Sequence, residues 1–241
     1  MDFNVPNHFI DLGSVKTENI DFEEESDKLR NILDFAQKEN DVQQYIKQNK
    51  KWFIPAALFR DYDFGHHSAY LVPEQSLGAE YKADYMLLGN NSIGHQIILV
   101  EFEDVNVDFK ILTANSETAS VRKGLTQIRD WKRWMDDHRI YFFDSCGLTE
   151  IGNSIPSWGI YYCLVVSRRN RMNEAANQLR RQMQAENPRL HIVTYDRLVD
   201  NLNCYPLPKR KTRLLSCLSF WVPLPLAFRC SVVQSPPCAI V

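Results

Sequence analysis

Residues 81–103 read YKADYMLLGNNSIGHQIILVEFE, which is two apolar runs joined by a cluster of Gly, Asn and Ser. The runs at 81–88 and 95–103 are rich in β-branched and aromatic side chains, and this composition predicts strands. The cluster at 89–92 predicts a turn. Two neighbouring strands joined by a short Gly/Asn loop should pair as an antiparallel hairpin.

This hairpin carries three acids, Asp84, Glu101 and Glu103. Residues two apart in a strand lie on the same face, so Glu101 and Glu103 should point the same way. If the numbers of opposed residues sum to about 185, Asp84 lies across from Glu101, with the two Cβ atoms ~5 Å apart. The three carboxylates would then converge on one point.

Converging carboxylates repel one another unless a cation neutralises them. Mg²⁺ binds carboxylate oxygens and favours phosphate oxygens, so the cluster predicts a metal site that can act on a phosphate ester. Glu80 would be an additional ligand if the first strand extends that far. The alternative is a solvated acidic face, but Ile97 and Leu99 share the face of Glu101 and Glu103, which is more typical of a cleft.

The remaining periodicity predicts an α/β fold with a mixed central sheet flanked by helices. Helical spacing is expected within 23–49, as two short helices, and at 116–138, 173–184 and 196–201. Extended structure is expected at 60–71, and further strands at 158–166 and 190–195.

Composition limits the partners. With 241 residues and a net charge of −2, the chain has no overall attraction to nucleic acid or anionic membrane, so DNA contacts would need local basic patches. The N-terminus lacks the basic and apolar regions of a secretory signal, so we expect a cytoplasmic protein with no membrane partner. The six cysteines have no zinc-binding spacing and are expected to be free thiols.

The spacing of the acids resembles that of the PD-(D/E)XK nuclease superfamily. An aspartate, Asp84, precedes Glu101-Phe102-Glu103 at the end of an apolar strand, and a helix bearing Gln127 follows. Over roughly residues 40–202 the chain resembles the Shedu anti-phage defence nucleases. The segments that carry this resemblance are DYMLL from residue 84, ILVEFED from 98, GLTQIRDWKRW from 124, GIYYCLVVSRR from 159 and HIVTYDRL from 191.

The resemblance implies a restriction-endonuclease-like core and a homo-oligomeric DNA endonuclease that uses Mg²⁺ or Mn²⁺ in defence against phage. It makes Asp84 and Glu101 metal ligands and places Gln127 among the catalytic residues. Glu103 stands where lysine is usual, so it would orient or deprotonate the attacking water. The replacement leaves the site one cation short.

Basic residues near these motifs are candidate phosphate contacts, although charge runs are more often solvated faces. The indole rings of Trp131 and Trp134 are expected in the core. The candidate nucleic-acid contacts are Lys123, Arg129, Lys132, Arg133, Arg168 and Arg169.

Three segments are expected. Residues 1–40 form an N-terminal leader and helix, 41–203 the PD-(D/E)XK-like nuclease domain, and 204–241 an atypical Cys- and Pro-rich tail. No Asp or Glu follows Asp200, although the chain holds 30, so the tail differs in kind from the rest. It is either a surface or docking segment, or the product of a reading-frame change near residue 204. No catalytic role is assigned to it.

Two other functions compete with the nuclease. A catalytically silent nucleic-acid-binding or sensor module on the same fold is favoured by the missing lysine and by the unusual tail. A sugar hydrolase that uses two carboxylates is a weaker candidate, because a third nearby carboxylate suits a metal better than a glycosidase acid pair.

Overall fold

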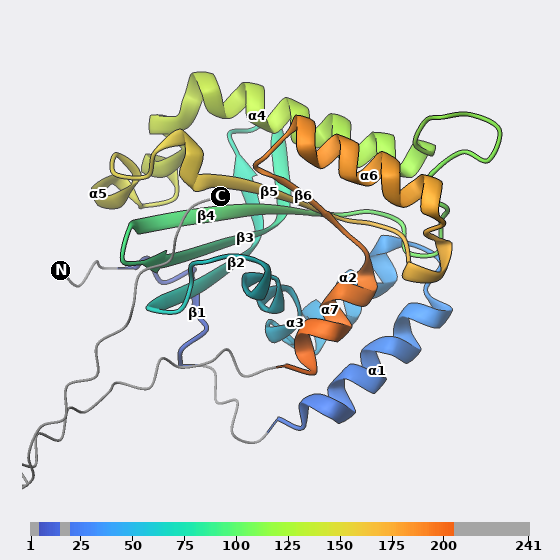
Figure 1. Ribbon diagram of the computed structural model, residues 1–241. Coiled ribbons are helices and arrows are strands. Elements are labelled where there is room, and N and C mark those ends of the chain that lie inside the picture. The colour runs from blue at the N-terminus through green and yellow to red at the C-terminus, as the bar shows by residue number, and fades with distance from the viewer. Residues whose placement is uncertain (1–4, 15–19, 205–241) are drawn as a thin grey trace, which may run out of the picture. The chain divides into compact units, whose positions relative to one another are not determined.

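The computed structural model describes residues 5–14 and 20–204 (Figure 1). Within them, six strands form one mixed sheet in the order β1-β2-β3-β4-β5-β6. The pairs from β1 to β4 are antiparallel, and β5 and β6 run parallel to β4. The expected mixed α/β sheet is therefore confirmed. The strands are β1 Ile10–Asp11, β2 Ser68–Leu77, β3 Tyr81–Asn91, β4 Gly94–Phe102, β5 Ile160–Val165 and β6 Leu190–Val193.

Helices cover both faces of the sheet (Figure 1). The α-helices are α1 Phe22–Phe35, α2 Glu39–Gln48, α3 Phe53–Ala56, α4 Ala119–Ser145, α5 Thr149–Gly152, α6 Glu174–Glu186 and α7 Tyr195–Leu202. Short 3₁₀ turns lie at η2 Ala57–Asp61, η3 Ser157–Gly159 and η4 Arg169–Arg171.

The core has two halves because side chains alternate across the sheet. Leu99 of β4 packs with Ile128 and Trp131 of α4 on one face. Val100 and Phe102, on the other face, pack with helices α1, α2, α3 and α7. This sandwich explains why β4 and β5 are almost continuously apolar in sequence.

The central hairpin has the expected register. Tyr85 lies opposite Val100, so the numbers of paired residues sum to 185 and Asp84 falls across from Glu101. The turn is later than expected, because β3 continues to Asn91. The Asn91 side-chain oxygen accepts hydrogen bonds from the amides of Ile93 and Gly94, at 2.8 and 3.3 Å. Gly94 has φ +137°, a conformation that disfavours any residue with a Cβ atom.

Three local expectations differ from the structure. The segment expected to be extended from 60 to 71 begins with the end of η2, and only its last residues belong to β2. The spacing of Leu29, Ile32, Leu33 and Phe35 predicts one apolar face for α1. Leu29 and Leu33 are buried, but Phe35 is 81% exposed. Helix α4 runs past 138 to Ser145, with a kink at His138, where the backbone leaves the helical conformation.

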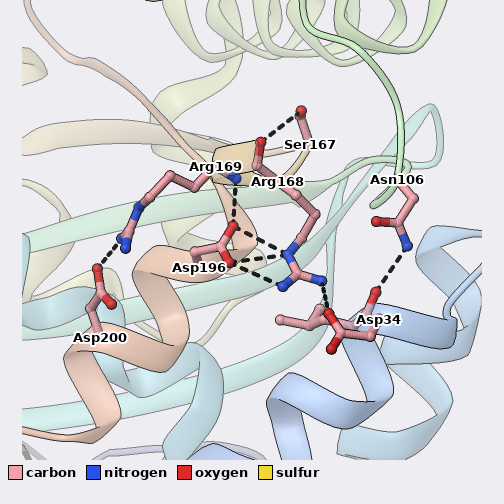
Figure 2. Close-up of polar contacts among 8 residues, drawn as sticks. Asp34, Asn106, Ser167, Arg168, Arg169, Asp196 and Asp200 are labelled. Carbon is pink, nitrogen blue, oxygen red and sulfur yellow. Dashed lines mark hydrogen bonds and ion pairs between the residues drawn. The ribbon is translucent and has the colours of Figure 1, made fainter. Parts of the chain in front are cut away.

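Arg168 joins the end of β5 to two helices (Figure 2). Its guanidinium donates to Asp34 of α1 at 2.9 Å and, through Nε, to Asp196 of α7 at 3.1 Å. The side chain is only 7% exposed. Arg169 forms an ion pair with Asp200 of α7, and its backbone amide donates to Asp196 at 2.6 Å.

This placement bears on two basic residues that were expected to contact nucleic acid. The Arg168 guanidinium lies inside the domain and is bound to two carboxylates, so it is not free to contact a phosphate. Arg169 is 65% exposed but is paired with Asp200. A buried arginine with two acidic partners acts as a structural link between helices.

The tail expected at 204–241 lies outside the described residues, apart from Cys204. Among the described residues, none of the helices combines the length and the apolar character needed to cross a bilayer. Cys146, Cys163 and Cys204 are free thiols, as expected for these positions.

Replacing Arg168 should test the link between β5, α1 and α7. Arg168→Ala leaves Asp196 without its buried cation, so we expect the free energy of unfolding to fall by about 3 kcal/mol in urea denaturation. Arg169→Ala is the matched control. It removes an exposed ion pair and should cost less than about 1 kcal/mol. Equal losses in the two variants would contradict the assignment.

Candidate functional site

Asp84 and Glu101 lie on neighbouring strands at one end of the sheet. The hairpin register sets them opposite each other, on the face that carries Leu99 and Met86. The backbone amide of Phe102 donates to Asp84 Oδ2 at 2.8 Å, which fixes the aspartate against β4. Glu101 is 6% exposed. The predicted facing of these two acids is therefore present in the structure.

Glu103 follows directly after β4 and is held by its backbone. Its amide donates to the carbonyl of Val165 at 2.9 Å, and its own carbonyl accepts from the hydroxyl of Tyr195 at 2.6 Å. The side chain is 1% exposed. One carboxylate oxygen, Oε1, is buried without a hydrogen-bond partner. An unpartnered buried carboxylate oxygen is costly, and a ligand that binds it would remove that cost.

Lys123 of α4 supplies a cation to this cluster. Its Nζ lies 3.0 Å from Glu103 Oε2 and 3.7 Å from Glu39 Oε2. Helix α4 can come this close because residue 124 is glycine. A Cβ atom there would lie 2.5 Å from Leu164 Cδ1 and 2.9 Å from Glu103 Cγ.

This contact corrects the expectation that the cluster is one cation short. The lysine that the motif lacks on the strand is matched by Lys123, which comes from the facing helix. Lys123 was expected to contact nucleic acid. In the structure its ammonium group is paired with Glu103, although the side chain remains 59% exposed.

Glu39 is a fourth acid that the sequence analysis missed. It begins α2, and the start of this helix is set by Asp41, whose carboxylate accepts from the amides of Gln37 and Lys38 at 2.7 and 3.1 Å. An acid in the first helical turn is ordinarily explained by the helix dipole. Sequence therefore holds no signal that Glu39 meets Lys123 and the hairpin acids.

Burial and mutual repulsion make these acids hard to ionise. Burial, followed by the charges of Asp84 and Glu103, raises the pKa of Glu101 to about 10. Burial raises the pKa of Asp84 to about 6, although the amide of Phe102 opposes this. Burial also raises the pKa of Glu103 to about 7, against the stabilising contact with Lys123. The cluster holds more negative charge than its surroundings stabilise.

The donor chemistry of the cluster fits a hard divalent cation, since it offers carboxylate oxygens and an unpartnered buried oxygen of Glu103. In the described part of the chain, however, no group of three or more His, Cys, Asp or Glu side chains is already gathered in a metal-holding arrangement. The predicted convergence of Asp84, Glu101 and Glu103 on one metal-holding point is therefore not present among the described residues. Asp84 Oδ2 is held by the amide of Phe102, and Glu103 Oε2 by Lys123.

A groove of about 690 Å³ flanks the cluster, between the start of β3 and α4. Gln127 lies in it and donates to the carbonyl of Lys82 at 3.5 Å, so this amide faces the sheet. Glu80 is an exposed wall residue of the groove. Because β3 begins at Tyr81, Glu80 does not share the strand face of Asp84, and the condition for its ligand role is not met.

The other basic residues of α4 are spread around the helix. Arg129 and Lys132 line a second groove of about 400 Å³, on the side of α6. The Lys132 ammonium group lies over the ring of Tyr162, 5.1 Å from its centroid. Arg133 is 73% exposed and 3.9 Å from Asp130. Trp131 and Trp134 are buried in the core, as expected.

The fold and the cluster together define a class: an α/β domain with self-repelling carboxylates at one end of a central hairpin, and a lysine from the facing helix among them. The chain belongs to the Shedu family. The family described as Shedu protein SduA, C-terminal, matches residues 36–199, and this family suggests a part in anti-phage defence. No curated protein matched the chain.

The raised pKa values predict how stability depends on pH. The stabilising contribution of Glu101 to the free energy of unfolding is fully present below its unfolded pKa of about 4.5. It is lost as the pH rises through the folded pKa of about 10. Glu101→Gln resembles the protonated acid at every pH. We therefore expect this variant to melt several degrees above the wild type at pH 8, without added metal, and close to it at pH 4.5.

Glu174→Gln is the control for this measurement, because Glu174 is an exposed acid of α6. Its melting profile should follow that of the wild type across the pH range. If Glu101→Gln does the same, the charge of Glu101 does not oppose folding and the electrostatic account of the cluster is wrong.

Proposed function

We propose that this chain is a metal-dependent endonuclease that hydrolyses phosphodiester bonds in DNA as part of anti-phage defence, on a PD-(D/E)XK-type core. The observation that carries the proposal is the hairpin register, which sets Asp84 across from Glu101, with Glu103 near enough for its charge to raise the pKa of Glu101. Membership in the Shedu family supports the defence role. A homo-oligomeric state remains a prediction from the resemblance.

In this proposal Asp84 and Glu101 hold the cation. A bound Mg²⁺ or Mn²⁺ supplies charge stabilisation on the phosphate and lowers the pKa of a coordinated water. The acids themselves resist ionisation when no cation is present, so their raised pKa values favour an occupant that neutralises them. Glu39 lies close enough to influence both acids and is a further candidate for holding the cation.

Glu103 and Lys123 are proposed to act as a pair. The unpartnered Oε1 of Glu103 can accept a proton from the attacking water, while Lys123 on Oε2 keeps the carboxylate oriented. The pKa of Glu103, raised to about 7, suits a general base near neutral pH. Lys123 also lines the neighbouring groove, where its charge would stabilise the phosphate under attack.

The groove along α4 is the proposed path of the DNA backbone. Besides Lys123 and Gln127, it is lined by Lys82 and Arg122, which could contact phosphates next to the scissile bond. Arg122 also lines the second groove with Arg129 and Lys132, so cationic side chains continue around the same helix. Such contacts would bind DNA by its backbone and give little sequence preference.

A catalytically silent DNA-binding or sensor module is the second candidate. The observation that favours it is the direct contact of Lys123 with Glu103, which neutralises a carboxylate without any metal. DNA binding that persists without divalent cation, together with an absence of nicking, would select this alternative.

Asp84→Asn should test the metal-dependent nuclease. We expect the wild-type protein to nick supercoiled plasmid with Mg²⁺ or Mn²⁺, and the variant to be slower by about a hundredfold or more, because a charged ligand is lost. The same cations should raise the melting temperature of the wild type and not that of Asp84→Asn. The control Asp137→Asn changes an exposed acid of α4 and should behave as the wild type.

Equal lack of cleavage by wild type and Asp84→Asn with both metals would contradict the nuclease proposal. A melting temperature of the wild type that does not respond to either cation would contradict the metal site itself. The two readouts are separate, so a protein that binds metal without cutting DNA would be recognised.

A paired substitution should test the role of Lys123. Lys123→Met should reduce plasmid cleavage more than it reduces DNA binding, because the lysine acts on Glu103. The double variant Lys123→Met/Glu103→Lys returns lysine to its usual motif position and should recover part of the lost rate. Lys132→Met is the control on the same helix, and a loss of binding equal in both single variants would make Lys123 an ordinary phosphate contact.

A further inference from the structure

A cavity of about 570 Å³ lies beside the edge strand β6, away from the carboxylate cluster. Residues of α6, β6 and α7 line it, together with Asp61 of η2 and Arg169 of η4. The proposed nuclease function makes no use of this cavity. Its charged lining consists of Arg169, Arg180, Arg197, Asp61 and Asp200.

The positive charge in this lining is only partly matched. Three arginines face two aspartates, which leaves a net charge of +1 if His191 is neutral. Arg169 is paired with Asp200, and Arg197 approaches Asp61 to 3.8 Å. Within the described residues, the hydrogen bond made by the Arg180 guanidinium goes to an uncharged partner, Asn177 Oδ1, at 3.1 Å.

Arg180 is in an unfavourable environment for a cation. Burial lowers its pKa, and the charges of Arg197 and Arg181 lower it further. Like charges that are partly withdrawn from water raise the free energy of the folded protein unless an anion lies between them. Burial also lowers the pKa of His191, which keeps that ring uncharged near neutral pH.

The edge of β6 is closed to an additional strand. The amide of Leu190 donates to the carbonyl of Asn187 at 2.8 Å, and the amide of Ile192 donates to the side-chain oxygen of Gln184 at 2.7 Å. A peptide added to the sheet would need these two donors. The cavity therefore suits a compact ligand better than an extended peptide.

We propose that this cavity binds a nucleotide-sized molecule that carries a phosphate monoester. The guanidinium groups of Arg180 and Arg197 would donate hydrogen bonds to the phosphate oxygens. Arginine suits this ligand because its planar donors match phosphate oxygens. A volume of about 570 Å³ falls within the usual range for small-ligand sites. His191 of β6 also lines the cavity, and its ring is stacked on that of Tyr62 with the centroids 4.5 Å apart.

Calorimetry on the full chain without divalent cation tests the proposal, with AMP, inorganic phosphate and adenosine as probes. AMP should bind, phosphate should compete with it, and adenosine should not bind. Arg180→Gln and Arg197→Gln should each weaken AMP binding about tenfold or more, because each removes a charge-assisted hydrogen bond. Arg181→Gln is the control, since Arg181 is an exposed neighbour paired with Glu174.

The thermal midpoint of each variant without ligand checks its folding. Arg180→Gln removes a repelling charge and should leave the midpoint unchanged or slightly higher, whereas Arg197→Gln also loses the approach to Asp61 and should lower it slightly. Oligonucleotides with a 5′-phosphate or a 5′-hydroxyl distinguish a free nucleotide from a DNA end or backbone. The proposal is overturned if wild-type protein does not bind AMP, if the two variants bind it as well as the wild type, or if both oligonucleotides displace AMP equally. Repeating the titration with Asp84→Asn keeps the result independent of nuclease activity.

Discussion

The contact between Lys123 and Glu103 offsets part of the electrostatic cost of the carboxylate cluster. The charges of Asp84, Glu103 and Glu39 raise the pKa of Glu101, and the side chains of Glu101 and Glu103 are almost fully buried. A buried negative charge is tolerated only with a partner. The helix that provides this partner can approach the sheet because Gly124 leaves room for Leu164, so packing and charge balance depend on the same turn of α4.

The hairpin could be predicted from the sequence because its alternation allows one register. A slip of one residue would turn Ile98, Val100 and Phe102 away from the helices that cover them. The same alternation is enough to place Asp84 across from Glu101. The turn was less predictable, since Gly89 and Asn90 have the composition of a loop but are paired within the sheet.

The partners of charged residues could not be predicted, because they come from distant parts of the chain. Glu39 precedes the hairpin by a whole strand and several helices, and an acid at the start of a helix has a local explanation. The arginines after β5 resemble a phosphate-binding run in sequence. Only the fold brings Asp34 and Asp196 to Arg168 and turns that residue into an internal link (Figure 2).

The hydroxyl of Tyr195, at the start of α7, donates a hydrogen bond to the carbonyl of Glu103. The carboxylate cluster is therefore supported by a helix that is synthesised after it. Tyr195 also packs edge-on against Phe102, with ring centroids 5.4 Å apart, so α7 closes the sheet face behind the acids. During translation this helix leaves the ribosome after every strand of the sheet has been made. A nascent chain that already holds Asp84, Glu101 and Glu103 therefore lacks the contacts of Tyr195 behind them until α7 has been made.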